Sequence, residues 1–112
     1  MRIDRKGLAG ALACAGVLLW AAASGAAAGP PAKRTVVIDG SSYAPAAITV
    51  KVGDSVTWVN KDPFPHTVTA AGKFDSRSIA ANGKWTWRAA KAGEYAYICT
   101  LHPNMKATLK VE

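Results

Sequence analysis

Metal-binding and redox-active side chains are scarce in this 112-residue sequence, which contains only two cysteines, two histidines and two methionines. A framework of several disulfide bonds is excluded, because at most one pair could form. The sequence also lacks the open runs of Met or His that proteins delivering or storing metal ions often use. The few donors that do occur are concentrated near the C-terminus, in the stretch ICTLHPNM (Ile98 to Met105).

Charge is absent from most of the N-terminal quarter of the chain. Three basic residues within the first six positions precede an uncharged, Ala-rich run from Gly7 through Pro31, which is typical of a secretory signal peptide. The triplet Ala26-Ala27-Ala28 predicts cleavage after residue 28, leaving residues 29–112 as a single domain in the periplasm, without membrane insertion. A retained membrane anchor is the alternative, because the run is long enough to span a bilayer. A lipoprotein attached through Cys14 is less favoured.

Acidic residues are also few, with 7 Asp and Glu against 14 Lys and Arg in the whole chain. Removal of residues 1–28, which hold three of the basic residues and one acidic residue, leaves a net charge of +5. The remaining basic residues are scattered along the chain, so a nucleic-acid partner is not indicated. The charge favours a partner with an acidic face, although it is equally explained by ordinary solubility.

No segment after residue 34 has the 3.6-residue periodicity of a stable amphipathic helix, and at most one helical turn is expected within residues 72–79. Short segments of alternating apolar and polar residues, separated by turn residues, instead predict β-strands. They span residues 35–39, 48–52, 55–60, 66–69, 84–88, 94–99 and 107–111. Seven or eight such strands predict an all-β fold, a Greek-key β-sandwich or barrel, with Ile48, Val56, Trp58 and Tyr97 in its core.

The C-terminal stretch offers a thiol, an imidazole and a thioether at Cys99, His102 and Met105, each separated from the next by two residues. We expect Cys99 at the end of one strand and His102 in the loop before the last strand. His66 follows a proline-rich turn and opens another predicted strand, where a sandwich would place it beside this loop. Taken singly, His66 is explained as a strand-end residue and Met105 as core filler. Together the four side chains predict a metal site.

The donor types favour copper over other metals. Zinc prefers thiolate, imidazole and carboxylate and rarely accepts a thioether, whereas two His, one Cys and a weak Met form the arrangement of blue-copper electron-transfer sites. Four protein ligands leave no open position for a substrate, which argues against an enzyme. A bound metal would also protect Cys99, which is the lone thiol once Cys14 has been removed by cleavage.

The segment from Ser42 to Glu112 resembles the cupredoxins, the type 1 blue copper proteins, and is most similar to amicyanin. The resemblance lies in VGDSVTWVN (Val52 to Asn60), FPHTV (Phe64 to Val68) and AGEYAYICTLHPNM (Ala92 to Met105). It implies that His66, Cys99, His102 and Met105 bind one copper ion, which cycles between Cu(I) and Cu(II). It also implies that the Asn60 side chain ties the two ligand loops together.

The resemblance further implies that a monomer shuttles single electrons between redox proteins, a dehydrogenase and a c-type cytochrome, through the exposed edge of His102. Amicyanins usually have proline at the position of Leu101, so this chain has an additional backbone N–H that we expect to raise the reduction potential if it points at the sulfur. Two other functions stay open at this stage. One is copper delivery without electron transfer, and the other is a structural sandwich that never binds metal.

Overall fold

The computed structural model describes residues 29–112, and the expected signal peptide, residues 1–28, lies outside the described residues. Nine strands follow one another: β1 (Lys33–Asp39), β2 (Ser42–Ala44), β3 (Ala47–Val50), β4 (Ser55–Asn60), β5 (Thr69–Ala70), β6 (Phe74–Asp75), β7 (Lys84–Arg88), β8 (Gly93–Cys99) and β9 (His102–Val111). The predicted all-β class is confirmed. The number of strands exceeds the expected seven or eight because β2, β5 and β6 have only two or three residues each.

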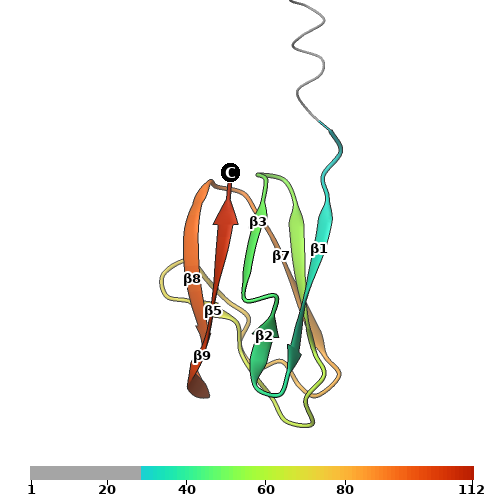
Figure 1. The fold of residues 1–112 in the computed structure, drawn as a ribbon, viewed down its shortest axis with the longest axis vertical. Helices are drawn as coiled ribbons and strands as arrows, with labels where there is room; N and C mark the ends of the chain where they lie inside the picture. The colour runs from blue at the N-terminus through green and yellow to red at the C-terminus, as the bar shows by residue number, and fades with distance from the viewer. Residues whose placement is uncertain (1–28) are drawn as a thin grey trace, which may run out of the picture. The chain divides into compact units, whose positions relative to one another are not determined.

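The strands form two sheets that face each other in a sandwich (Figure 1). One sheet has the order β2-β1-β4-β7, and the other has the order β3-β9-β8-β5-β6. β1 runs parallel to β4, and β3 runs parallel to β9, whereas the other neighbours are antiparallel. Sequence neighbours such as β3 and β4 therefore lie in different sheets, as crossing connections in a Greek-key sandwich require.

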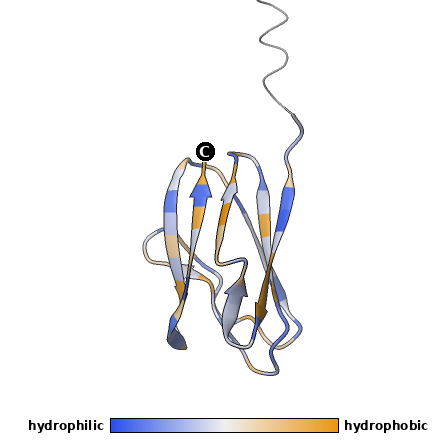
Figure 2. Ribbon diagram, in the orientation of Figure 1, coloured by the Kyte–Doolittle hydropathy of each residue, from blue (hydrophilic) through white to orange (hydrophobic). Residues whose placement is uncertain are grey.

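Alternating burial along each strand builds the core between the sheets. In β4 the side chains of Val56, Trp58 and Asn60 are buried, and the residues between them are half-buried. The same alternation is visible as changes of hydropathy along the strands in Figure 2. Because successive side chains point to opposite faces of a sheet, this pattern directs every second residue into the sandwich.

Aromatic rings fill the centre of the sandwich. The indole N–H of Trp58 donates to the Tyr97 hydroxyl at 3.1 Å, and the two rings meet edge to face with centroids 5.5 Å apart. Phe74 extends this group toward Trp85 and Trp87 on the edge strand β7. Together with Ile48 and Val56, the Trp58 and Tyr97 side chains are buried as predicted. Edge-to-face contacts stabilise such a group beyond its buried area and restrict its motion.

The structure differs from the predicted strands mainly between residues 66 and 79. His66 forms only an isolated antiparallel bridge with Ile79, and regular pairing begins at Thr69. Residues 74–75 pair with β5 as a short strand, so the helical turn considered for residues 72–79 is absent from this segment. The N–H groups of Thr67 and Val68 donate to the side chains of Cys99 and Ser76 instead of to a neighbouring strand. A buried Phe74 anchors the second segment to the core.

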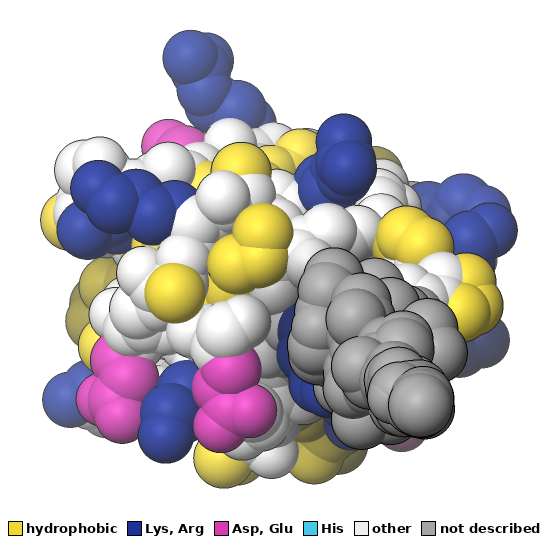
Figure 3. Space-filling model, turned by 90° about the horizontal axis from the view of Figure 1, so that it is seen from above, with side chains coloured by type: hydrophobic (Ala, Val, Ile, Leu, Met, Phe, Trp, Pro, Cys, Tyr) yellow, Lys and Arg dark blue, Asp and Glu magenta, His cyan; other side chains and the backbone are white. Residues whose placement is uncertain are grey.

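On the face drawn in Figure 3, the basic side chains are spread out rather than gathered in one patch. Figure 3 looks at one end of the domain, where Lys and Arg side chains stand apart from one another among hydrophobic and acidic groups. This agrees with the scattered distribution expected from the sequence. Among residues 29–112 the structure contains no helix with the length and apolar character needed to cross a bilayer.

Candidate metal centre

A tight hairpin between β8 and β9 positions two of the predicted donors. Cys99 is the last residue of β8 and His102 is the first residue of β9, and the two are paired across the turn formed by Thr100 and Leu101. His102 therefore begins the last strand instead of lying in the loop before it, as the sequence had suggested. The strand register shifts between Ile98 and Cys99, which leaves residues 103–105 bulging from the ladder next to the site.

The third donor comes from the connection between β4 and β5, which joins one sheet to the other. His66 lies between β4 and β5, and its backbone N–H and C=O both bond to Ile79, at 3.2 and 2.8 Å. The buried side-chain amide of Asn60 donates to the carbonyls of Phe64, Ile79 and Ala80. These bonds fasten the proline-containing loop before His66 to the segment around residue 80.

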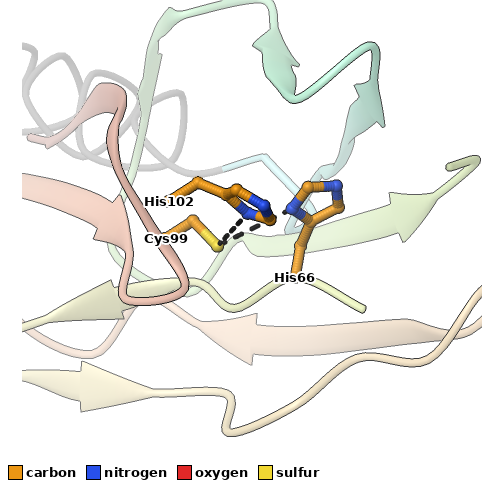
Figure 4. A group of neighbouring side chains, drawn as sticks. All are labelled: His66, Cys99 and His102. Carbon is orange, nitrogen blue, oxygen red and sulfur yellow. Dashed lines mark hydrogen bonds between the residues drawn. The ribbon is translucent and has the colours of Figure 1, made fainter. Parts of the chain in front are cut away.

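The three donor atoms converge on one point, as Figure 4 shows. The Nδ1 atoms of His66 and His102 each lie 3.7 Å from the Sγ atom of Cys99, and all three donor atoms lie within 4.8 Å of one another. Bonds of about 2.3 Å to sulfur and about 2.0 Å to nitrogen, as at zinc, hold these atoms about 3.7 Å apart when the bond angle is about 120°. The two sulfur–nitrogen distances therefore match those expected around one shared metal ion.

Burial differs among the four predicted ligands. Cys99 and His66 are both fully buried, and Met105 is 4% exposed, whereas His102 is exposed. Met105 lies in the bulge of the same hairpin and lines a shallow depression together with His102 and Pro103. The structure thus brings Cys99 and both imidazoles together at the end of the sandwich, with the buried Met105 in the adjoining bulge. Their role as ligands stays a prediction.

Thr67 links the two ligand segments around the sulfur. Its backbone N–H donates to Cys99 Sγ at 3.3 Å, and its hydroxyl oxygen accepts the N–H of Thr100 at 2.9 Å. Asn60 was expected to provide this link. In the described part of the chain, however, its side chain bonds to the backbone of residues 62, 64, 79 and 80 and not to the hairpin that carries Cys99. Sequence analysis missed Thr67, because the pairing depends on a contact between residues 33 positions apart.

The N–H that reaches the sulfur therefore belongs to Thr67. Within residues 29–112 no hydrogen bond joins the Leu101 N–H to Cys99, and Leu101 is 53% exposed at the tip of the turn. The expected effect of Leu101 on the thiolate consequently lacks its structural basis. Tyr43 supports the same region, since its hydroxyl donates to the carbonyl of Thr67. Burial is the main cause that raises the pKa of Tyr43, and the nearby Cys99 raises it further. The hydroxyl therefore stays protonated.

Asp62 contacts a predicted ligand, and sequence analysis missed it. Its carboxylate lies 2.7 Å from Nε2 of His66, and both side chains are buried. The N–H of Ser41 and the N–H of Gly40 also donate to it. The Ser41 bond is the largest influence that lowers the pKa of Asp62, despite the opposing effect of burial, with further contributions from Gly40 and His66. The only sequence signal was an acidic residue four positions before a histidine.

Comparison with known proteins gives consistent results. Residues 11–111 match the model of the cupredoxin-like domain. Amicyanin from Paracoccus versutus is 33% identical over 94 residues, covering 78% of this chain and 71% of the relative. Chloroplastic plastocyanin from Tetradesmus obliquus is 35% identical over 81 residues, covering 62% and 56%.

Solved structures agree with the sequence relatives. An oxidized amicyanin variant superposes with a TM-score of 0.68 and 30% sequence identity, covering 71% of this chain and 82% of that chain. The match confirms the resemblance expected from the motifs around Trp58, His66 and Cys99. The chain belongs to the cupredoxin-like family, and amicyanins are among its relatives.

Proposed function

We propose that this protein is a periplasmic type 1 copper protein that carries single electrons between redox partners. The observation that carries the proposal is the convergence of the two imidazoles on the Cys99 sulfur, each with Nδ1 at 3.7 Å. The chemistry of the donors supports copper in particular, since Met105 adds a soft thioether to the same hairpin. We assign His66, Cys99, His102 and Met105 as the ligands.

Copper supplies a centre that accepts and releases one electron without forming or breaking bonds to a substrate. The chain's contribution is to keep the donors nearly still, so that little rearrangement accompanies each transfer. Cys99 is held by strand β8 and by the Thr67 N–H, while His66 is held by its backbone bridge to Ile79. Four protein donors leave no position for a substrate, so the protein is a carrier and not an enzyme.

The exposed surface around His102 is suited to brief contacts with partner proteins. Phe64 and Leu101 are large apolar side chains that are 41% and 53% exposed, and the Phe64 ring lies 6.0 Å from the His102 ring. A small apolar area of this kind buries little surface in a complex, which permits rapid dissociation. We propose that electrons pass along the His102 ring edge to and from proteins such as a dehydrogenase and a c-type cytochrome.

The location follows from the N-terminal sequence. We propose that residues 1–28 are a signal peptide that directs export, and that residues 29–112 then act in the periplasm as a monomer. Mass spectrometry of the exported protein tests this directly, because cleavage after Ala28 predicts an N-terminus at Gly29. Recovery of the full-length chain in the membrane fraction would instead support a retained anchor.

Copper titration of the metal-free exported protein tests the function. We expect one copper per chain, a strong visible band from thiolate to Cu(II), and a type 1 EPR spectrum. A Cys99→Ser variant should lose the band, because the thiolate that produces it has been removed. Copper binding without colour would favour copper delivery, and no binding at all would favour a structural sandwich.

A further inference from the structure

We infer that Asp62 is a positioning residue for the metal centre: it fixes the tautomer and orientation of His66 and lowers the reduction potential of the bound metal. The part that concerns the potential rests on the proposed copper function. The part that concerns His66 can be tested without metal. The Asp62 carboxylate contacts two backbone N–H groups as well as the imidazole.

Both oxygens of the Asp62 carboxylate are occupied. Oδ1 accepts the N–H of Gly40 at 2.7 Å, whereas Oδ2 accepts the N–H of Ser41 at 2.9 Å and lies 2.7 Å from His66 Nε2. The backbone N–H of Asp62 in turn donates to Oδ1 of Asn60 at 2.9 Å. A carboxylate that accepts several N–H bonds is stabilised as the anion. The residue that faces His66 is therefore a fixed negative charge.

The turn between β1 and β2 is shaped to provide these donors. Gly40 and Ser41 have φ angles of 61° and 55°, which lie in the left-handed region that non-glycine residues rarely adopt. Successive N–H groups in such a turn point to one side and form a concave site for an anion. The turn thus holds the Asp62 carboxylate in place independently of any metal.

This arrangement determines which nitrogen of His66 carries the proton. A carboxylate only accepts hydrogen bonds, so the proton of a neutral imidazole must reside on Nε2, which donates to Asp62. Nδ1 then has a free lone pair, and it is this atom that faces Cys99 Sγ at 3.7 Å. A histidine ligand held by a carboxylate in this way is oriented before the metal arrives.

The charge of Asp62 also acts on the metal. It lies directly behind a ligand imidazole in a buried setting, where charges are poorly screened, and a negative charge there favours Cu(II) over Cu(I). Loss of a carboxylate partner of a ligand histidine commonly weakens metal binding about tenfold or more. If the affinity for Cu(II) falls tenfold and the affinity for Cu(I) does not change, the reduction potential rises by about 59 mV.

An Asp62→Asn variant, with Asp54→Asn as the matched control, tests the inference. Asp54 is also buried and accepts two backbone N–H bonds, from Ala32 at 2.8 Å and Lys51 at 2.9 Å, but these bonds lie away from the candidate ligands. Electrochemistry of the copper-loaded proteins should give a higher potential for Asp62→Asn and an unchanged potential for Asp54→Asn. An equal or lower potential for Asp62→Asn, or the same shift in both variants, would overturn the effect on the metal.

Nitrogen-15 NMR of the metal-free wild type provides a second test that needs neither copper nor a folded variant. The His66 ring should show a protonated Nε2 and an unprotonated Nδ1, and this single tautomer should become mixed in Asp62→Asn if that variant folds. A wild-type ring with its proton on Nδ1 would overturn the positioning role. Failure of the wild type to bind copper would instead overturn the proposed function and leave the tautomer result to decide the role of Asp62.

Discussion

The two histidines of the candidate metal centre occupy opposite surroundings. His66 is fully buried, its ring contacts Asp62, and its backbone is paired with Ile79. His102 is exposed at the beginning of β9, and its neighbours include the exposed ring of Phe64. The comparison teaches that the candidate centre combines one predicted ligand fixed by the interior with another that is open to solvent. Rigidity and access are thus assigned to different residues.

The largest expected effect comes from removing each histidine in turn. In His102→Gly the blue absorbance should be lost and then largely restored by added imidazole, because the vacated space opens to solvent. In His66→Gly it should be lost and not restored, since the space is enclosed and the variant loses about 2–5 kcal/mol of stability, as other large buried truncations do. Visible absorbance with and without imidazole measures both. Equal rescue of the two variants would contradict the comparison.

A metal ion that joins the β8–β9 hairpin to the segment around His66 should stabilise the fold. Zinc fits the Cys and His donors and is redox-inert, so it separates binding from electron transfer. At about 1,000 times its dissociation constant, the wild type should gain about 4 kcal/mol in the free energy of unfolding. Chemical denaturation with and without zinc measures the gain, and Cys99→Ser should show little or none. A similar gain in Cys99→Ser would show that zinc binds elsewhere.

A smaller effect is expected at Asp54, where a carboxylate supports the backbone without contacting an imidazole. The N–H bonds from Ala32 and Lys51 are the main influences that lower the pKa of Asp54 below that of a free aspartate. Its stabilising contribution is therefore complete above about pH 3.9, the ordinary value, and is lost as the pH falls through the lower folded-state pKa.

Denaturation of Asp54→Asn and the wild type across this range measures the effect. The wild type should be more stable at neutral pH, and the difference should shrink as the pH falls below about 3.9. The copper absorbance at neutral pH should be the same in both proteins. A stability difference that stays constant down to strong acid would contradict the prediction.

The smallest effect is expected at Leu101, on the open side of the centre. Because the N–H that donates to the sulfur is that of Thr67, Leu101→Pro should leave the reduction potential nearly unchanged. Electrochemistry of the copper-loaded variant tests this. A clear fall in potential would revive the view that the N–H of Leu101 withdraws electron density from the thiolate.

The parts of the fold that depend on local pattern were predictable from sequence. The bounds of β4 and β7 match the predicted segments, because alternation and the turn residues beside them define both ends. The start of β9 was predicted five residues too late. The two-residue turn after Cys99 closes so tightly that pairing begins at His102 at once, a property that alternation alone does not reveal.

The predicted ligands of the candidate site could be identified from the sequence, but the residues that hold them in place could not. Cys99, His102 and Met105 share one short motif, and His66 follows a proline-rich turn, so their chemistry was readable. Thr67 was missed because its role arises from a contact with Cys99, 32 positions away. Asp62 lies only four positions before His66, but the N–H groups that hold its carboxylate are distant, such as that of Ser41 at 21 positions. Such contacts depend on the packing of the two sheets.

The unequal sequence distances within the centre have a consequence for its assembly. Three predicted donors share one hairpin, whereas His66 is separated from Cys99 by 33 positions. Short loops close at a lower entropic cost than long ones, so during folding the hairpin donors come together before the distant imidazole joins them. Chains that are still folding would then pass through a state in which only the hairpin donors are assembled, and an ion bound in that state would be enclosed once the two sheets pack together.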